Sequence, residues 1–371
     1  MTTAEPNAIW RYGQPVRIVA GNGALNRLPD LVQADRVLLV CSKGCVRRGL
    51  ARRAVALLGK SRVSVYDQVV PNPQLDDLDA AAHSLRVESI NAIVAIGGGS
   101  ALDTGKVLSA LVPSNQSNCL ERIFRHGQNQ ALDQRIPVVA IPTTSGTGAE
   151  MTPFATVWDR QTHRKHSLAG DALYPETAIL DPALTLDLPR RVTLHTGLDA
   201  VSHAMESLWN KNRTPISEAF AVQAVKLIHS AFGNVLEQPD HMDSRAGMLW
   251  ASALAGLAIS QTRTAIAHAM SYPLTLRHEV PHGLACGFAL PAIWEHCRHM
   301  DPGTLDTPEI RRTMELLKSL DIVGELRHYL DPADLFDLVL PEAAKADRAG
   351  NYIGGMDRAT CEGIIAGALR C

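Results

Sequence analysis

The sequence predicts an open parallel α/β sheet followed by an all-α region, and three observations support this prediction. The first half alternates short β-branched runs with helical stretches, whereas the second half is rich in Ala, Leu and His and has few strand signals. Two of the predicted strands end directly in glycine-rich turns. We place the boundary at LDLPRRVT, where a proline and an arginine pair interrupt the pattern, and expect domains over residues 1–188 and 189–371.

Five apolar runs are the predicted strands of the first domain. They are apolar on both faces, which is typical of parallel strands covered by helices on both sides. The segments between them are long enough for crossover helices. The runs are PVRIVA from Pro15, RVLLVC from Arg36, RVSVY from Arg62, AIVAI from Ala92 and PVVAI from Pro137.

Composition and charge favour a folded protein with a small-molecule partner. Of 371 residues, 46% are hydrophobic and 20% are charged, which suits two globular domains with filled cores. The formal net charge is -2, from 36 basic and 38 acidic side chains mixed along the chain. Such a balance gives no long-range field that would attract nucleic acid or an anionic membrane. We therefore expect a small-molecule substrate and neither nucleic acid nor a membrane as partner.

Targeting signals and cysteine spacing indicate a cytoplasmic protein. No apolar run reaches the roughly 18 residues of a membrane span. The N-terminal MTTAEPNAIWRYG lacks the basic-then-apolar layout of a signal peptide. The seven cysteines are scattered without CxxC spacing, which predicts reduced thiols rather than a disulfide framework or a thiolate zinc site.

The first glycine-rich turn, IGGGSALDTGK, follows AIVAI directly and leads into a predicted helix. Gly97, Gly98 and Gly99 allow positive φ angles and close approach of a ligand, while the helix N-terminus near Ser100 offers unpaired N–H groups. These features suit a pyrophosphate, although neither GxGxxG nor the P-loop motif is matched. The alternative is a tight strand-to-helix turn without a ligand.

A second polar turn, TTSGTGAE, follows PVVAIP and contains Thr143, Thr144 and Thr147. Two such turns at the carboxyl ends of parallel strands are typical of the binding crevice of a Rossmann-like, dinucleotide-binding sheet. Asn72 in PNP also follows a predicted strand and would line the same edge, or it belongs only to a rigid turn.

The end of RVLLVC bears on the choice between the two nicotinamide coenzymes. An acidic side chain at this corner hydrogen-bonds the ribose 2′-OH of NADH and repels the 2′-phosphate of NADPH. Here the strand is followed by Ser42 and Lys43, without a carboxylate. We therefore expect NADPH to be tolerated or preferred if this is the ribose corner.

The stretch GLDAVSHAMES places Asp199 and His203 four residues apart, hence on one face of a helix. The two side chains could bind each other, a proton or a metal. A lone histidine in an apolar helix is more often a hydrogen-bonded core residue than a metal ligand. His268 and His282 would complete a set of one oxygen and three nitrogen donors, which suits Fe(II) or Zn(II) without thiolates. Because Pro273 lies between these two histidines, we expect them at the end of one helix and the start of the next.

Five motifs in this order resemble the iron-dependent (group III) alcohol dehydrogenase family along nearly the whole chain: IGGGSALDTGK, IPTTSGTGAE, GLDAVSHAMES, AIAHAMSYPL and VPHG. The resemblance implies a dinucleotide-binding domain, a C-terminal helical metal-binding domain and a homodimer. It implies NADPH or NADH as cofactor, and Fe(II) or Zn(II) held by Asp199, His203, His268 and His282. The cofactor residues that it implies are Gly97, Gly98, Gly99, Ser100, Asp103, Thr143, Thr144 and Lys165.

The resemblance also implies the chemistry. The metal polarises an aldehyde carbonyl while nicotinamide delivers hydride, and a proton must then reach the alkoxide. Many members carry a second histidine four residues after the one that matches His268, where this chain has Tyr272. The tyrosine hydroxyl could relay the proton, or the ring only packs against Pro273.

Within the family, the chain resembles the branch of phosphonoacetaldehyde reductases, which form 2-hydroxyethylphosphonate. The similarity lies in TPFATVWD, HAMESLWNKNRTPIS, LAGLAISQTRTAIAHAMSYPLT and PHGLACGFALP. A phosphonate needs cations near the metal, and the candidates are Arg263 and Lys211 with Asn210 and Asn212.

Several alternatives stay open. Another small aldehyde or alcohol, or maleylacetate, could be the substrate, and a glycerol dehydrogenase or dehydroquinate synthase relative would share the fold. The remote alternative is a nucleotide- or metal-binding protein without catalysis.

Overall fold

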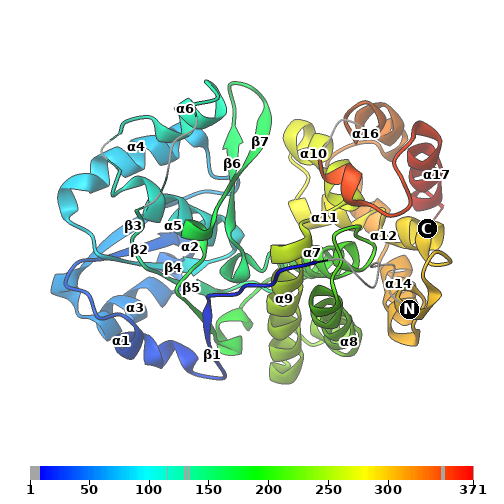
Figure 1. Cartoon of the computed structure of the whole chain (residues 1–371). Helices are drawn as coiled ribbons and strands as arrows, with labels where there is room; N and C mark the ends of the chain where they lie inside the picture. The colour runs from blue at the N-terminus through cyan, green and yellow to red at the C-terminus, as the bar shows by residue number, and fades with distance from the viewer. Residues whose placement is uncertain (1–8, 115, 129–131, 133, 344–346, 371) are drawn as a thin grey trace. The chain divides into compact units, whose positions relative to one another are not determined.

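The computed structural model describes residues 9–114, 116–128, 132, 134–343 and 347–370, which fold into two compact units (Figure 1). The α/β unit comprises Gln14–Thr144 and Ala149–Thr185. The helical unit comprises residues 9–13, Ser145–Gly148 and the chain from Leu186 onward. Two short pieces of the first half of the sequence therefore belong to the helical unit.

A six-stranded sheet forms the centre of the α/β unit. Its strands are all parallel and are ordered β1-β8-β5-β4-β2-β3. Strand β3 lies on one side of β2, and the next strand along the chain, β4, lies on the other side of β2. The order of the strands in the sheet therefore reverses between β2 and β4. The strands are β1 Arg17–Ala20, β2 Val37–Ser42, β3 Val63–Val69, β4 Ala92–Gly97, β5 Val138–Pro142 and β8 Thr177–Leu180.

Alternating side chains of the inner strands fill two separate apolar layers. Leu38 and Val40 of β2 point to one face, where they pack with helices α4 and α5, whereas Leu39 and Cys41 point to the other face with α1 and α3. Because both faces are buried, the inner strands read as continuous apolar runs. The helices are α1 Leu28–Leu31, α2 Lys43–Arg47, α3 Leu50–Leu58, α4 Leu75–Leu85, α5 Gly99–Leu111 and α6 Cys119–Phe124.

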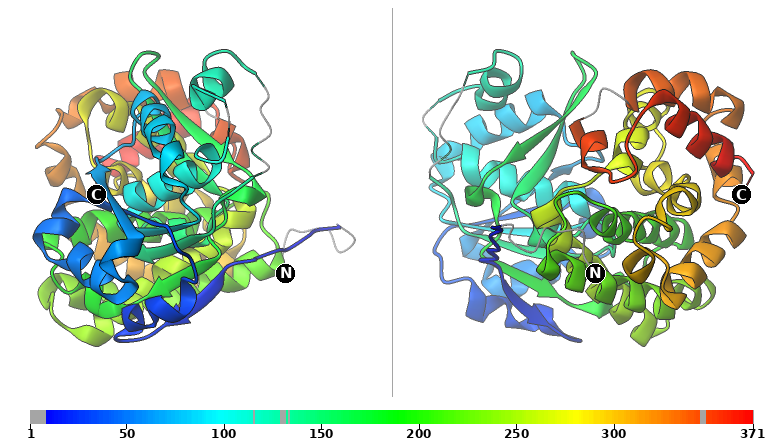
Figure 2. Two further views of the ribbon diagram at one scale, coloured as in Figure 1. Left: turned by 90° about the vertical axis from the view of Figure 1, so that its left-hand side faces the viewer. Right: turned by 45° about the vertical axis from the view of Figure 1, so that its right-hand side comes forward.

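The five predicted strands are β1 to β5, and the α/β fold with a helical second half is confirmed. The sequence reasoning missed β8 and the antiparallel hairpin of β6 Phe154–Asp159 and β7 Arg164–Ala169, which extends away from the parallel strands (Figures 1 and 2). Strand β7 reads RKHSLA and has no apolar run, and β8 is only four residues long. Neither therefore carries the signal by which the inner strands were found.

The helical unit is built around α7 and α8, whose apolar faces share one core with α9 to α17. Helix α8 begins at Pro215 because Thr214 and Ser217 form a capping box. Its bounds and those of its neighbours are α7 Arg190–Leu208, α8 Pro215–Glu237, α9 Met242–Thr262, α10 Ile266–His278, α11 His282–Gly287, α12 Leu290–Cys297, α13 Pro302–Leu305, α14 Pro308–Ser319, α15 Ile322–Leu326, α16 Leu335–Ala343 and α17 Arg358–Ala368.

Helix α8 is also long and apolar enough to cross a membrane by length and composition, contrary to the expectation that no segment would be. In the most apolar 18-residue stretch of α8, 44% of the residues are buried within the protein. Ala221, Val225 and Phe232 of this helix lie in the core of the helical unit. These contacts are those of a core helix.

Gly105 lets α5 approach the sheet, since a Cβ there would lie 2.6 Å from Cβ of Ala95 in β4. We predict that Gly105→Ala lowers the midpoint of thermal unfolding, although alanine is the better helix former by about 1 kcal/mol. Gly363 in α17 is the control, because a Cβ there meets nothing within 4 Å. Gly363→Ala should raise the midpoint or leave it unchanged. Equal effects of the two substitutions would contradict the close packing of α5.

Candidate metal centre and glycine-rich crevice

Helix α7 places Asp199 and His203 one turn apart inside the helical unit. They are only 3% and 5% exposed, and Asp199 Oδ1 lies 3.7 Å from His203 Nε2. The i,i+4 spacing therefore brings the two donor atoms to one buried point.

Helices α10 and α11 bring two further histidines to the same point. His268 Nε2 lies 3.8 Å from Asp199 Oδ1, and the His268 ring centroid is 4.9 Å from that of His203 and 5.0 Å from that of His282. His282 starts α11 as expected, but His268 is the third residue of α10 and not near its end. The expectation was wrong because α10 continues through Pro273 to His278.

Close packing of α11 on α7 fixes the position of His282. A Cβ at Gly283 would lie 1.8 Å from the carbonyl oxygen of His195, and a Cβ at Gly287 would lie 2.9 Å from Cβ of Leu198. Only glycine therefore permits this approach, and it places the first residue of α11 beside Asp199.

The four side chains fit a divalent metal ion. Asp199 Oδ1 is buried and has no hydrogen-bond partner among the described residues, as expected of a ligand atom. Two N or O donors about 2.1 Å from one ion at tetrahedral angles would be ~3.4 Å apart. The 3.7 and 3.8 Å separations from Asp199 Oδ1 to the imidazoles of His203 and His268 are close to this value.

Hydrogen bonds orient two of the imidazoles toward Asp199. His203 Nδ1 donates to the carbonyl oxygen of Gly146 at 3.2 Å, and His268 Nδ1 donates to Glu206 Oε2 at 2.5 Å. The backbone N–H of His268 donates to Glu206 Oε1 at 3.1 Å. Both Nε2 atoms thereby keep their lone pairs for a metal. The sequence reasoning missed Glu206, although its place seven residues after Asp199 on the same helix was a usable signal.

Burial and charge set the protonation of the site. Burial lowers the pKa of His203, which favours the neutral, ligating imidazole. Burial also lowers the pKa of His268, but the neighbouring Cys286 and Glu206 outweigh it and raise that pKa to about 10. A metal that binds His268 must therefore displace a proton from Nε2, and its affinity falls as the pH is lowered.

A thiol also lies in the site. Ligand atoms of Asp199, His268, His282 and Cys286 all lie within 4.8 Å of one another. The sequence reasoning predicted a ligand set without thiolates and did not place Cys286 beside it. Cys286 belongs to no CxxC pair, but its place four residues after His282 on one helix was a usable signal that the sequence reasoning did not follow.

In the α/β unit, the glycine-rich turn leads from β4 into α5. Gly97 ends β4 with φ of 154°, and a Cβ there would lie 2.7 Å from Cβ of Ala101. Gly98 is the N-cap with φ of -77°, and Gly99 and Ser100 form the first turn of α5. Of these three glycines, Gly97 is the one that uses the freedom to adopt a positive φ. The free N–H groups of this 13-residue helix still face the end of the strand.

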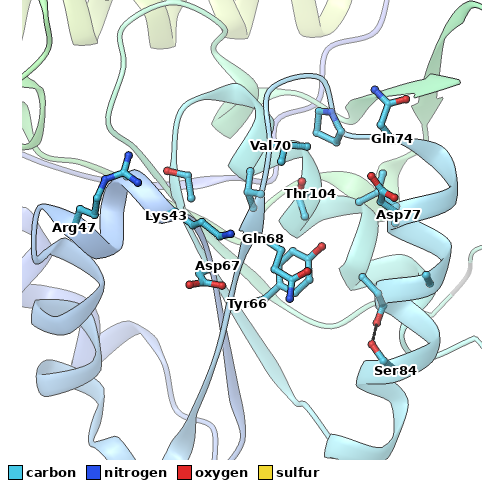
Figure 3. A pocket seen from close by; sticks show the side chains of 17 residues that line it. Lys43, Arg47, Tyr66, Asp67, Gln68, Val70, Gln74, Asp77, Ser84 and Thr104 are labelled. Carbon is cyan, nitrogen blue, oxygen red and sulfur yellow. Dashed lines mark hydrogen bonds between the residues drawn. The ribbon is translucent and has the colours of Figure 1, made fainter. Parts of the chain in front are cut away.

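The reversal of strand order places Ser42 beside this turn. Ser42 ends β2, which pairs with β4, and its hydroxyl caps α2 by accepting from the N–H of Cys45. A pocket of about 820 Å³ opens at the ends of β2 and β3 (Figure 3). Lys43 and Arg47 line it, and so do the carboxylates of Asp67 and Asp77.

The other residues of the expected cofactor site are held in different ways. Thr143 and Thr144 follow β5, and Thr144 packs against the Cα of Gly98. Asp103 accepts from the N–H of Thr156 at 2.8 Å and pairs with Lys106 at 3.3 Å, so both of its oxygens have protein partners.

Three residues of that expected set remain. Lys165 lies on β7 with its Nζ 5.6 Å from the Trp158 ring centroid. Asn72 lies between β3 and α4 with φ of 57°. Thr147 belongs to the helical unit and not to the unit that holds the others.

Tyr272 and Arg263 lie on the elements that carry His268. Tyr272 is half-buried on α10, where burial raises its pKa to about 12 and its hydroxyl is hydrogen-bonded to Arg348. Arg263 is exposed in the turn between α9 and α10, with φ of 61° and ψ of 180°. The sequence reasoning missed Arg348, which is eighty residues from the motif that contains His268.

Lys211 and its two asparagine neighbours donate hydrogen bonds to backbone carbonyl oxygens. Asn210 Nδ2 donates to the carbonyl oxygen of Arg263 at 3.2 Å, and Asn212 Nδ2 donates to that of Thr262 at 3.4 Å. Lys211 Nζ donates to the carbonyl oxygen of Gly350 at 3.0 Å. These contacts position the turn that carries Arg263.

Comparison with known proteins agrees with this arrangement. Residues 15–182 match the iron-containing alcohol dehydrogenase model, and residues 193–328 match the C-terminal model of the same family. The chain belongs to the iron-containing alcohol dehydrogenase family. It is accordingly a metal-dependent oxidoreductase that uses a nicotinamide dinucleotide.

Several relatives are similar over most of their length. Sulfoacetaldehyde reductase of Bilophila wadsworthia is 34% identical over 74% of this chain and 71% of its own. The crystal structure of sulfoacetaldehyde reductase from Bifidobacterium kashiwanohense in complex with NAD+ is 27% identical, covers 98% of both chains and has a TM-score of 0.84. An iron-containing alcohol dehydrogenase from Thermotoga maritima is 28% identical over 98% of this chain and 100% of its own, with a TM-score of 0.83.

We predict that Glu206→Gln weakens metal binding by about 10- to 100-fold, because the neutral amide no longer holds the His268 imidazole by a charge-assisted hydrogen bond. Competition with a chromophoric chelator would measure the affinity. Glu237→Gln, an exposed change at the end of α8, is the matched control and should leave it unchanged. Equal affinities of Glu206→Gln and wild type would contradict the role of Glu206.

Proposed function

We propose that this dehydrogenase reduces phosphonoacetaldehyde to 2-hydroxyethylphosphonate, with the metal held by Asp199, His203, His268 and His282. The observation that carries the proposal is the exposed guanidinium of Arg263, held on a strained turn that leads directly into the helix of His268. Two of the similar proteins are named sulfoacetaldehyde reductases. Sulfoacetaldehyde is likewise a two-carbon aldehyde that carries an anion, which supports an anionic substrate here.

The backbone of Arg263 supports a functional role for this residue. A non-glycine residue with φ of 61° and ψ of 180° is strained by about 1–3 kcal/mol. Its carbonyl oxygen accepts from Asn210 Nδ2 at 3.2 Å and from Thr262 Oγ1 at 2.9 Å, and these bonds hold the turn. The backbone of Arg263 is therefore fixed, and its planar guanidinium can pair with two oxygens of a phosphonate.

Arg348, in the 3-10 helix Asp347–Asn351, supplies a second cation beside the helix of His268. It is hydrogen-bonded to Tyr272, which lies one turn after His268 on α10. The charges of Glu206 and Cys286 act on the pKa of Tyr272, so this side chain lies near two residues that adjoin the proposed metal ligands. Arg348 and Arg263 are therefore the cations that we assign to the phosphonate, in place of Lys211.

The metal, the glycine-rich turn and Tyr272 each have a separate role in the proposed reaction. A bound divalent metal supplies the Lewis acid that polarises the carbonyl. Gly97, Gly98, Gly99 and Ser100 hold the pyrophosphate of the nicotinamide coenzyme at the N-terminus of α5. Tyr272 keeps its hydroxyl proton at neutral pH, because its pKa is raised to about 12, and Arg348 orients that hydroxyl. Tyr272 therefore acts as a hydrogen-bond donor to the substrate oxygen.

Maleylacetate and uncharged aldehydes are the competing substrates. An uncharged aldehyde needs no cation, whereas maleylacetate is also anionic but is much longer than a two-carbon chain. Rates with the three substrates therefore separate the alternatives.

The reduced state of the cysteines supports a cytoplasmic location, since the six described cysteines are free and buried. The homodimer remains an expectation from the family resemblance.

NADPH should bind at least as well as NADH, because Lys43 and Arg47 line the pocket beside Ser42. We predict that Lys43→Gln raises KM for NADPH by about fivefold to tenfold and changes KM for NADH little. Steady-state rates with each coenzyme would measure this, with Lys60→Gln as a control outside the pocket. A much weaker binding of NADPH than NADH to wild type would overturn the assignment.

Wild-type protein should prefer phosphonoacetaldehyde to propanal in kcat/KM, and Arg263→Gly should remove that preference. A charge-assisted hydrogen bond is worth about 1.5–3 kcal/mol, so KM for the phosphonate should rise roughly 10- to 100-fold while KM for propanal stays unchanged. Glycine tolerates the turn, so the midpoint of thermal unfolding should not fall. Steady-state kinetics and thermal unfolding are the measurements.

Lys211→Gln is the matched control and should leave both KM values unchanged. Equal kcat/KM for phosphonoacetaldehyde and propanal in wild type would sink the substrate proposal and leave the family assignment intact. A preference for maleylacetate would indicate that Arg263 binds that substrate instead.

A further inference from the structure

We propose that Cys286 is a sulfur donor to the metal held by Asp199, His268 and His282, and that this sulfur makes the centre favour Zn(II) over Fe(II). The proposal rests on the metal centre of the proposed function and not on its substrate. It adds a ligand that the sequence motifs did not indicate.

The position of Cys286 Sγ carries the proposal. It lies 3.8 Å from both ring nitrogens of His282, and the ligand atoms of the four residues all lie within 4.8 Å of one another. A zinc ion about 2.3 Å from sulfur and about 2.0–2.1 Å from nitrogen holds the two atoms ~3.6 Å apart at tetrahedral angles. Sulfur and imidazole can therefore bind one ion with only small shifts.

Helix α11 aims this sulfur at the site. His282 and Cys286 are four residues apart on α11 and therefore share one face, and Cys286 is 0% exposed. The two other described cysteines of the helical unit face elsewhere. Cys361 Sγ contacts Met356 Sδ at 3.6 Å, and Cys297 is hydrogen-bonded to Tyr352.

A second observation points independently to an ion at this place. Asp199 is 3% exposed, yet its Oδ1 has no hydrogen-bond partner among the described residues. A buried carboxylate oxygen without a partner is costly, and an ion shared with Cys286 would satisfy it.

The presence of sulfur changes which metal is bound. Three imidazoles and a carboxylate accept iron and zinc alike, whereas a soft thiolate donor favours zinc over Fe(II). With His203 the centre would offer five donors, so binding of a substrate oxygen would require one of these donors to leave the metal.

X-ray absorption spectroscopy of the zinc-loaded full chain tests the proposal directly. We expect a sulfur scatterer at about 2.3 Å beside the nitrogen and oxygen scatterers at about 2.0–2.1 Å. The sulfur shell should be absent in Cys286→Ser and in Cys286→Ala, and retained in Cys361→Ser. Bound zinc with only nitrogen and oxygen neighbours in wild type would overturn the proposal, and this result needs no variant to fold. A wild-type chain that binds no zinc would overturn the metal centre as well.

Metal competition supplies the second measurement. Under anaerobic conditions, Cys286→Ser should lose Zn(II) affinity by about tenfold or more and lose less Fe(II) affinity. Equal losses for both metals, or no loss, would contradict the preference for zinc.

Discussion

Two buried carboxylates on one helix are the constraint on which the helical unit depends. Asp199 and Glu206 lie on the same face of α7 and are 3% and 0% exposed. An ionised carboxylate in an apolar core costs several kcal/mol unless it is paired and hydrogen-bonded. Glu206 is satisfied by the backbone and imidazole of His268, and this contact ties α10 to α7. Asp199 lies beside the imidazoles of His203 and His268, with which it would share a metal ion as a direct ligand.

The same constraint explains the close packing of the neighbouring helices. Imidazoles can reach Asp199 only if α11 lies unusually near α7, and glycine at 283 and 287 makes this approach possible. Segment Ser145–Gly148 contributes in the same way, because the carbonyl oxygen of Gly146 fixes the ring of His203. A Cβ at Gly148 would also lie 2.6 Å from Cα of Gly256 in α9. The metal centre is thus built by backbone proximity as much as by its side chains.

A buried cation has the corresponding role in the α/β unit. Lys106 of α5 is 0% exposed, and its Nζ donates to carbonyl oxygens of Ala149 and Phe154 at 2.9 and 2.5 Å and pairs with Asp103 at 3.3 Å. Burial lowers the pKa of Lys106, and the charge of Asp103 opposes that shift. This network ties the helix that follows the glycine-rich turn to the segment that follows β5. Both polar turns at the sheet edge are therefore held by one buried ion pair.

The sequence by itself determined the α/β and helical halves, the inner strands and the placement of Asp199 and His203 on one face of a helix. These features depend on local periodicity, since buried parallel strands are continuously apolar and i,i+4 residues share a helix face. Strands β7 and β8 could not be predicted, because their pairing depends on distant partners and not on their own apolar content. Only the tertiary structure decided that Glu206 would orient His268, that Arg348 would contact Tyr272 and that Cys286 would lie near Asp199 and His268. Such contacts follow from how closely helices approach, which the sequence encodes only through glycines such as Gly283.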